Sequence, residues 1–208
     1  MFTLKSQAFE DGGLIADSFA EANLVSPPLN WIDVPKGTKS FALAVTDPDV
    51  PDVFQFPRVF VHWMVYDIPA TVTSLPEGAS PGGSMPSGTK ELNTDFVTFN
   101  IPGYGKHYGG PWPPDASHRY VFTLYALKNE TLDIPEGGDY LDFVKAVLPV
   151  TITTATLLGN YGPAKAPSTR ELKGHAGYPG ASRLGDHPPR YPFQEQAIPA
   201  NPVNEHRR

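Results

Sequence analysis

The sequence contains no cysteine, and this absence excludes several kinds of chemistry. Disulfide bonds, thiolate metal ligands and a cysteine nucleophile are all ruled out. Long apolar runs are also missing, because no segment approaches the roughly 18 uninterrupted apolar residues of a membrane-spanning helix. The first residues, MFTLKSQAFEDGG, lack the charged start and the apolar core of a signal peptide. We therefore expect no transmembrane segment and a cytoplasmic location.

Charged residues are scarce: they make up 18% of the chain, and the formal net charge is −6. A nucleic-acid-binding surface would need a strong basic patch against this balance, so nucleic acid is not an expected partner. Proline and glycine are frequent, with 24 and 19 residues, and 12% of residues are aromatic. This composition is typical of a folded, β-rich domain with many rigid loops.

One stretch, residues 109–127, joins a rigid loop to a strand. Its sequence is GGPWPPDASHRYVFTLYAL. The prolines and glycines of the first half favour an extended, turn-rich loop. From residue 118 onward the residues alternate in the pattern of a largely buried β-strand. His118, Arg119 and Tyr120 lie at the junction, where a rigid loop and a rigid strand can together hold a binding site.

Other segments also have the composition of strands. Residues 2–9, 39–46 and 58–68 are short, apolar and β-prone. In the third segment, alternation predicts one face with Val59, Val61, Trp63, Val65 and Asp67, and an opposite face with Phe60, His62, Met64 and Tyr66. A further short strand is expected at Asp95–Phe99, inside a long Gly/Pro/Ser-rich excursion between residues 75 and 110.

Two short helices are predicted towards the C-terminal end of the domain. Asp139 can cap a helix over Tyr140–Leu148, whose apolar residues recur at helical spacing. Pro149 separates it from a second predicted helix over Val150–Leu158. Four threonines weaken that second prediction, because β-branched side chains have a low helix propensity.

His62 has two interpretations. In an apolar strand, a histidine is ordinarily a core residue bonded to a backbone carbonyl. Alternatively, antiparallel pairing could bring it to one rim with the acidic turn DPDVP at residues 47–51 and with residues 118–120. The strand pattern leaves both interpretations open.

Seven motifs occur in the order that is found in a known family. They are FEDGG, NLVSPPLNW, KSFALAVTDPDVP, FVHWMVYDIPA, LPEGA, YGGPWPP and HRYVFTLYAL. Through them, residues 1–162 resemble the phosphatidylethanolamine-binding protein (PEBP) family, specifically its prokaryotic Raf kinase inhibitor-like branch. The resemblance implies a mainly β fold, a PEBP-like β-sandwich with Greek-key strands, one or two short C-terminal helices and long Pro/Gly-rich loops. It also implies a soluble binding or regulatory protein that holds a small anion or phosphorylated ligand and modulates a partner such as a kinase or protease.

The resemblance also implies which residues bind the ligand. They are Asp47, Asp49, His62, Gly110, Pro111, Trp112, His118 and Tyr120. Imidazoles, a phenol hydroxyl and the Gly110 N–H are donors that together can form an anion-binding cup without a lysine. Glycine at 110 would let a ligand approach the backbone closely, and Trp112 adds a bulky ring near the pocket mouth.

Three expectations concern the support of this pocket. Asp47 should fix one imidazole and raise its pKa, so that anion affinity falls as pH rises. Arg119 points away from Tyr120 and should form an ion pair with Asp49. The Val50–Pro51 peptide bond is expected to be cis.

Two alternatives use the same residues. An enzyme could perform acid–base chemistry on a small molecule with Asp47, His62, His118 and Tyr120, although no nucleophile accompanies them. A metal site could form from His62, His118 and Asp47 with His107 in reserve, but no HxH or HxxxH spacing supports it. We therefore expect no metal and no cofactor.

Residues 163–208 are rich in proline, carry scattered aromatic residues and show no hydrophobic period. We expect a C-terminal extension packed on the surface of the domain or on a partner subunit. An extension of this kind could embrace a second copy of the chain, which predicts a homodimer.

Overall fold

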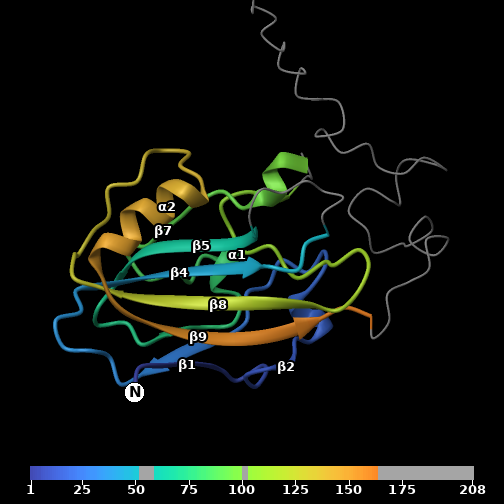
Figure 1. The fold of residues 1–208 in the computed structure, drawn as a ribbon, viewed down its shortest axis with the longest axis horizontal. Helices are drawn as coiled ribbons and strands as arrows, with labels where there is room; N and C mark the ends of the chain where they lie inside the picture. Colours follow the sequence, from blue (N-terminus) through green and yellow to red (C-terminus); the bar gives the residue numbers. More distant parts are fainter. Residues whose placement is uncertain (52–58, 100–102, 164–208) are drawn as a thin grey trace, which may run out of the picture.

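The computed structural model describes residues 1–51, 59–99 and 103–163, which form two β-sheets with a few short helices (Figure 1). The larger sheet has the strand order β2-β9-β8-β4-β5-β7, and the smaller one β1-β3-β6. The larger sheet contains β2 (Gly13–Leu14), β4 (Ser40–Asp47), β5 (Phe60–Pro69), β7 (Lys90–Glu91), β8 (His118–Leu127) and β9 (Thr151–Tyr161). The smaller contains β1 (Thr3–Ser6), β3 (Leu29–Ile32) and β6 (Ser74–Leu75). This is the mainly β architecture that the sequence predicts.

Helical segments are short and lie in the connections between strands. The α-helices are α1 (Ala79–Gly82) and α2 (Tyr140–Val147), and the 3-10 helices are η1 (Asp17–Phe19), η3 (Asp95–Phe99) and η4 (Leu148–Val150). The capped helix predicted after Asp139 is confirmed as α2. The Asp139 carboxylate accepts hydrogen bonds from the N–H groups of Leu141 and Asp142, which are among the donors that a helix start leaves unpaired.

The large sheet buries both of its faces. On one face, Phe41, Leu43 and Trp63 pack in a cluster that includes Leu4 of β1 and Trp31 of β3. On the other face, a second cluster joins apolar residues of β4 and β5 to the buried side of α2; its members include Ala44, Met64, Tyr66, Phe143 and Val147. The domain therefore has three layers, with the large sheet between α2 and the small sheet (Figure 1).

The prediction of a second helix over Val150–Leu158 is wrong. This segment forms most of β9, which pairs along its whole length with β8, from His118 opposite Tyr161 to Leu127 opposite Thr151. The alternation of β-branched threonines with apolar residues suits a strand that presents one face to a core. Pairing with β8 therefore outweighs the weak helical spacing.

The short strand expected at Asp95–Phe99 is also wrong, since this segment is the 3-10 helix η3. The Asp95 carboxylate accepts the Val61 N–H at 2.8 Å, where a paired strand would offer a backbone carbonyl. The Asp95 side chain thus accepts a backbone hydrogen bond of β5 that a neighbouring strand would otherwise accept. The expected cis peptide at Val50–Pro51 is wrong as well; among the described residues the cis bond precedes Pro81.

The β4–β5 register corrects the predicted faces of β5. Val45 lies opposite Trp63 and Thr46 opposite Val61, so the register shifts at His62, which is left without a partner residue on β4. Such a β-bulge changes the direction of side chains on its two sides. Simple alternation predicts that Val61 shares a face with Trp63. In the structure, Val61 instead packs with Met64 in the α2 cluster, while Trp63 belongs to the other cluster.

Candidate functional site

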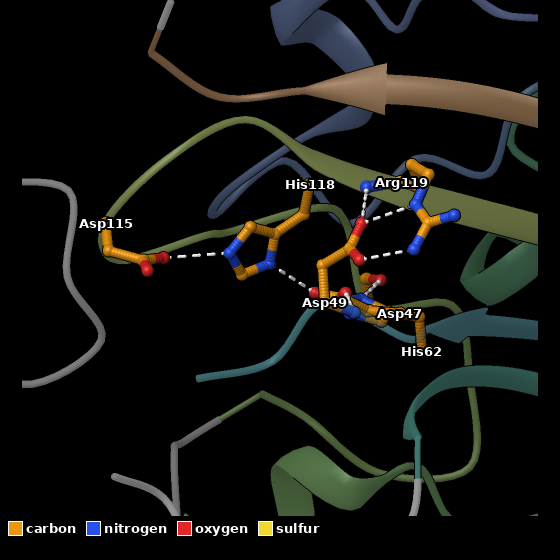
Figure 2. Close-up of polar contacts among 7 residues, drawn as sticks. Asp47, Asp49, His62, Asp115, His118 and Arg119 are labelled. Carbon is orange, nitrogen blue, oxygen red and sulfur yellow. Dashed lines mark hydrogen bonds and ion pairs between the residues drawn. The ribbon is translucent and has the colours of Figure 1, made fainter. Parts of the chain in front are cut away.

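Pairing of two central strands brings Asp47 and His118 together. Asp47 is the last residue of β4 and His118 the first of β8, and the strands are antiparallel, with Thr46 opposite Val121. The His118 Nδ1 lies 2.7 Å from the Asp47 Oδ2, and each residue is only 3% exposed. The acidic turn and the HRY junction that the sequence singles out thus meet at one end of the sheet (Figure 2).

A second carboxylate holds the other nitrogen of the same ring. His118 Nε2 lies 2.8 Å from Asp115 Oδ1, so the imidazole lies between Asp115 and Asp47 (Figure 2). Both nitrogens can donate to carboxylates only when the ring carries its second proton. Burial disfavours that charge, but the hydrogen bonds and charges of Asp47 and Asp115 outweigh burial and raise the pKa of His118. The expectation that Asp47 raises an imidazole pKa is confirmed.

Asp115 is a site residue that the sequence analysis missed. Its side chain is 34% exposed, far more than those of Asp47 and His118. The available signal was its spacing, since Asp115 precedes His118 by three residues in a tight loop. Nothing in the composition distinguished Asp115 from the other acidic residues in loops.

The predicted ion pair between Arg119 and Asp49 is confirmed. Arg119 donates from Nε to Asp49 Oδ2 at 2.8 Å and from Nη2 to Oδ1 at 2.6 Å, and its backbone N–H also donates to Oδ2. The side-chain hydrogen bonds of Arg119 hold the pKa of Asp49 below its usual range. Asp49 thereby fixes the start of β8 to the turn after β4, and its expected contact with a ligand stays a prediction.

His62 has the environment of a core histidine. Its Nδ1 lies 2.9 Å from the Gly109 carbonyl oxygen, and its ring contacts those of Phe60, Phe96 and Tyr120 at centroid distances of 5.0 to 5.1 Å. Burial lowers the pKa of His62, although Asp47 opposes this shift. The structure therefore gives His62 a neutral ring that anchors the 109–112 loop to β5.

Tyr120 contributes a buried hydroxyl to the same end of the sheet. The residue is fully buried, and its hydroxyl has no partner of hydrogen-bond geometry among the described residues. Burial and then the charge of Asp47 raise the pKa of the phenol well above its usual value. The group is therefore a neutral donor with an unsatisfied hydrogen bond, which is costly unless a partner is supplied.

The loop residues Gly110 and Pro111 contact the protein itself. A Cβ on Gly110 would lie 2.8 Å from the Ala20 Cα and from the Phe19 carbonyl oxygen. The Pro111 carbonyl accepts the Glu21 N–H at 2.7 Å. Close packing against residues 19 and 20 is a structural reason for the glycine, and the expected approach of a ligand to Gly110 stays a prediction.

No group of three or more His, Asp or Glu side chains within the described ranges is arranged to hold a metal ion. Nor does any described helix have the length and apolarity to cross a membrane. The domain is thus a β-sandwich that carries at one rim the buried pair Asp47–His118, the partly exposed Asp115, and a phenol hydroxyl on Tyr120 whose proton has no acceptor among the described residues.

Comparison with known proteins identifies the family. A family model described as phosphatidylethanolamine-binding protein matches residues 5–162. A UPF0098 protein of Methanothermobacter thermautotrophicus is 36% identical over 159 residues, covering 76% of this chain and 97% of that protein. A UPF0098 protein of Chlamydia pneumoniae is 40% identical over 160 residues, with shares of 76% and 97%. The chain therefore belongs to the PEBP family.

Solved structures of prokaryotic relatives have a similar fold. Escherichia coli YbcL, described as a new member of the mammalian PEBP family, superposes with a TM-score of 0.69 at 31% identity, covering 78% of this chain and 98% of YbcL. The Chlamydia trachomatis PEBP homologue CT736 gives a TM-score of 0.66 at 34% identity, with shares of 78% and 97%. The prediction of a prokaryotic PEBP-family protein is confirmed.

The raised pKa of His118 predicts a pH-dependent contribution to stability. The folded protein binds the His118 proton more tightly than the unfolded chain, whose histidine has a pKa of about 6.5. This contribution is complete below about pH 6.5 and is lost as pH rises through the folded-state pKa. We expect the free energy of unfolding of wild type, relative to His118→Gln, to fall over that interval by about 1.4 kcal/mol per unit of pKa shift.

Urea denaturation of both proteins from about pH 5.5 to 9 measures this difference. His62 is present in both proteins, so its own titration largely cancels. A difference between the two proteins that stays constant with pH would contradict the Asp47–His118–Asp115 arrangement.

A second prediction concerns Gly110. Gly110→Ala should destabilise the fold by about 1–3 kcal/mol, because the new methyl group would overlap backbone atoms of residues 19 and 20. Gly105→Ala is the matched control, since a Cβ there meets only the His107 Nε2, at 4.0 Å. Equal urea midpoints for the two variants would show that the packing against residues 19 and 20 is not tight.

Proposed function

We propose that the end of the sheet around His118 binds a small anion, such as inorganic phosphate or a phosphorylated group, and that the protein acts by binding and not by catalysis. The observation that carries this proposal is the His118 ring, whose raised pKa favours a cation and whose Nε2 faces a partly exposed carboxylate. An anion oxygen can accept the hydrogen bond that Asp115 accepts now. A charge-assisted bond of this kind is among the strongest that a protein offers to an anion.

Tyr120 supports the proposal independently. Its buried hydroxyl lacks an acceptor within the described part of the chain, and its high pKa keeps it protonated. An anion bound beside His118 would supply an acceptor. Asp47 is then the residue that keeps the imidazole charged, and Arg119 neutralises Asp49 so that this second carboxylate repels an anion less.

Asp115 must move aside when an anion binds. Asp47, Asp115 and an anion around one imidazolium would place three negative groups around a single positive charge, and like charges at such distances repel strongly. Asp115 is the most exposed member of the set, and it lies in the loop before β8. We therefore propose that Asp115 competes with the ligand for Nε2.

Catalysis is supported less well by the same geometry. Asp47 and His118 resemble a base with its orienting carboxylate, but the nitrogen that would accept a substrate proton is bonded to Asp115. His62, another residue of the enzyme alternative, uses its Nδ1 to hold the loop and is enclosed by aromatic rings.

Modulation of a kinase or protease, the cytoplasmic location and the homodimer remain predictions. The chain from residue 164 onward, to which the homodimer prediction refers, lies outside the described residues.

Phosphate-dependent thermal unfolding tests the proposal. Added phosphate should raise the unfolding midpoint of wild type, because a ligand of the folded state stabilises it by mass action. The rise should become smaller as pH rises through the raised pKa of His118, since the ring then loses its charge. His118→Gln should abolish it, while Asp115→Asn should increase it near pH 5.5, where the ring is protonated in both proteins.

Sodium chloride at matched ionic strength controls for general screening. Asp133→Asn, which removes an exposed carboxylate away from the site, controls for the change in net charge. An equal phosphate response in wild type and His118→Gln would overturn the proposal. A weaker response in Asp115→Asn than in wild type would refute the competition by Asp115 but not the binding of an anion at His118.

A further inference from the structure

A cavity separate from the proposed anion site has a different chemistry. Its volume is about 310 Å³, at the lower end of the range of small-molecule sites. It is lined by the acidic residues Asp17 and Glu21, by the aromatic residues Trp112 and Tyr161, and by apolar residues such as Ile15. Asp47, His118 and Tyr120 do not line it, so it is separate from the site of the proposed function.

The lining carries negative charge without a compensating cation. Among the described residues that line the cavity there is no lysine, arginine or histidine, whereas Asp17 and Glu21 each carry a carboxylate. This distinguishes the cavity from the His118 site, where each carboxylate has a cationic partner. A ligand with positive charge would supply the missing partner.

Glu21 is held in place at several points. Its backbone N–H donates to the Pro111 carbonyl at 2.7 Å, its own carbonyl accepts from the Tyr104 hydroxyl at 3.1 Å, and its Oε1 accepts from the Tyr161 hydroxyl at 3.1 Å. Its φ of 54° lies in the left-handed region, which costs energy for a residue with a side chain. The carboxylate is therefore preorganised at the cavity wall.

The aromatic residues add a second preference. Trp112 and Tyr161 border the same cavity as the two carboxylates. Indole and phenol faces attract cations, and they attract a planar guanidinium most, since it can also stack. Guanidinium also forms forked hydrogen bonds with carboxylates, while an ammonium group is a compact point charge.

We infer that this cavity binds a guanidinium group, paired with Asp17 and Glu21 and stacked against Trp112 or Tyr161. Two sources can present that group. One is an arginine-bearing peptide or small molecule from outside. The other is the chain itself, because Pro163 lines the cavity and the residues that follow contain seven Lys and Arg against four Asp and Glu, although the whole chain has a net charge of −6.

Titration of the full-length protein with Nα-acetyl-L-arginine amide tests the inference. The indole N–H of Trp112 gives an NMR signal within the cavity wall, and its shift reports occupancy. We expect saturable binding that weakens by about tenfold or more in Glu21→Gln and in Asp17→Asn, since each loses a charge-assisted hydrogen bond. Glu130→Gln, an exposed carboxylate outside the cavity, is the charge-matched control, and Nα-acetyl-L-lysine amide should bind more weakly than the arginine probe.

A full-length variant with Arg170, Arg183, Arg190, Arg207 and Arg208 each changed to glutamine separates the two sources. If the chain supplies the guanidinium, this variant will bind the probe more tightly than wild type, and its Trp112 signal will differ before any probe is added. If the group comes from outside, both proteins will bind the probe equally. An absence of probe binding in both proteins, or binding that is unchanged in both Glu21→Gln and Asp17→Asn, would overturn the inference. Because the readout involves neither phosphate nor His118, its failure is distinct from failure of the anion site.

Discussion

The antiparallel pairing of β4 with β8 is the constraint on which the candidate site depends. It joins two strands far apart in the sequence and places the last residue of one against the first residue of the other. Because β4 and β8 lie in the middle of the large sheet, with both faces covered, the backbone under Asp47 and His118 has little freedom. Arg119 adds a second tie between the same two elements through Asp49. A buried imidazolium between two carboxylates is tolerable only in such a rigid frame, since each charge needs its partner at close range.

The parts that were predictable from sequence are those with a local cause. Alternation along 118–127 identified β8, the spacing after Asp139 identified α2, and the opposite directions of adjacent strand residues predicted the Arg119–Asp49 pair. Each depends on periodicity or on a cap, which the chain carries within a few residues. The family motifs singled out Asp47 and His118, which the structure brings together at one end of the sheet.

The parts that failed depend on partners distant in the sequence. The segment from 151 to 161 became a strand because β8 offered a long unpaired edge, and no local pattern shows such an edge. The bulge at His62 depends on the register with β4. Asp115 was missed for a related reason: its importance arises only once the ring of His118 is fixed by Asp47 from the other side.

The 109–113 loop lies between two regions for which we propose opposite charge preferences. Its Gly109 carbonyl holds His62, its Pro111 carbonyl holds Glu21, and Trp112 lines the acidic cavity. At the His118 end, histidine and arginine balance the carboxylates, so the remaining donors favour an anion. At the Glu21 end, the Glu21 carboxylate accepts the Tyr161 hydroxyl, and the described residues that line the cavity include no cationic side chain, which is why we propose a cation there. The two regions share this proline-rich segment. The difference between the two proposed ligand preferences therefore follows from which carboxylates have cationic partners among the described residues, although the same loop borders both regions.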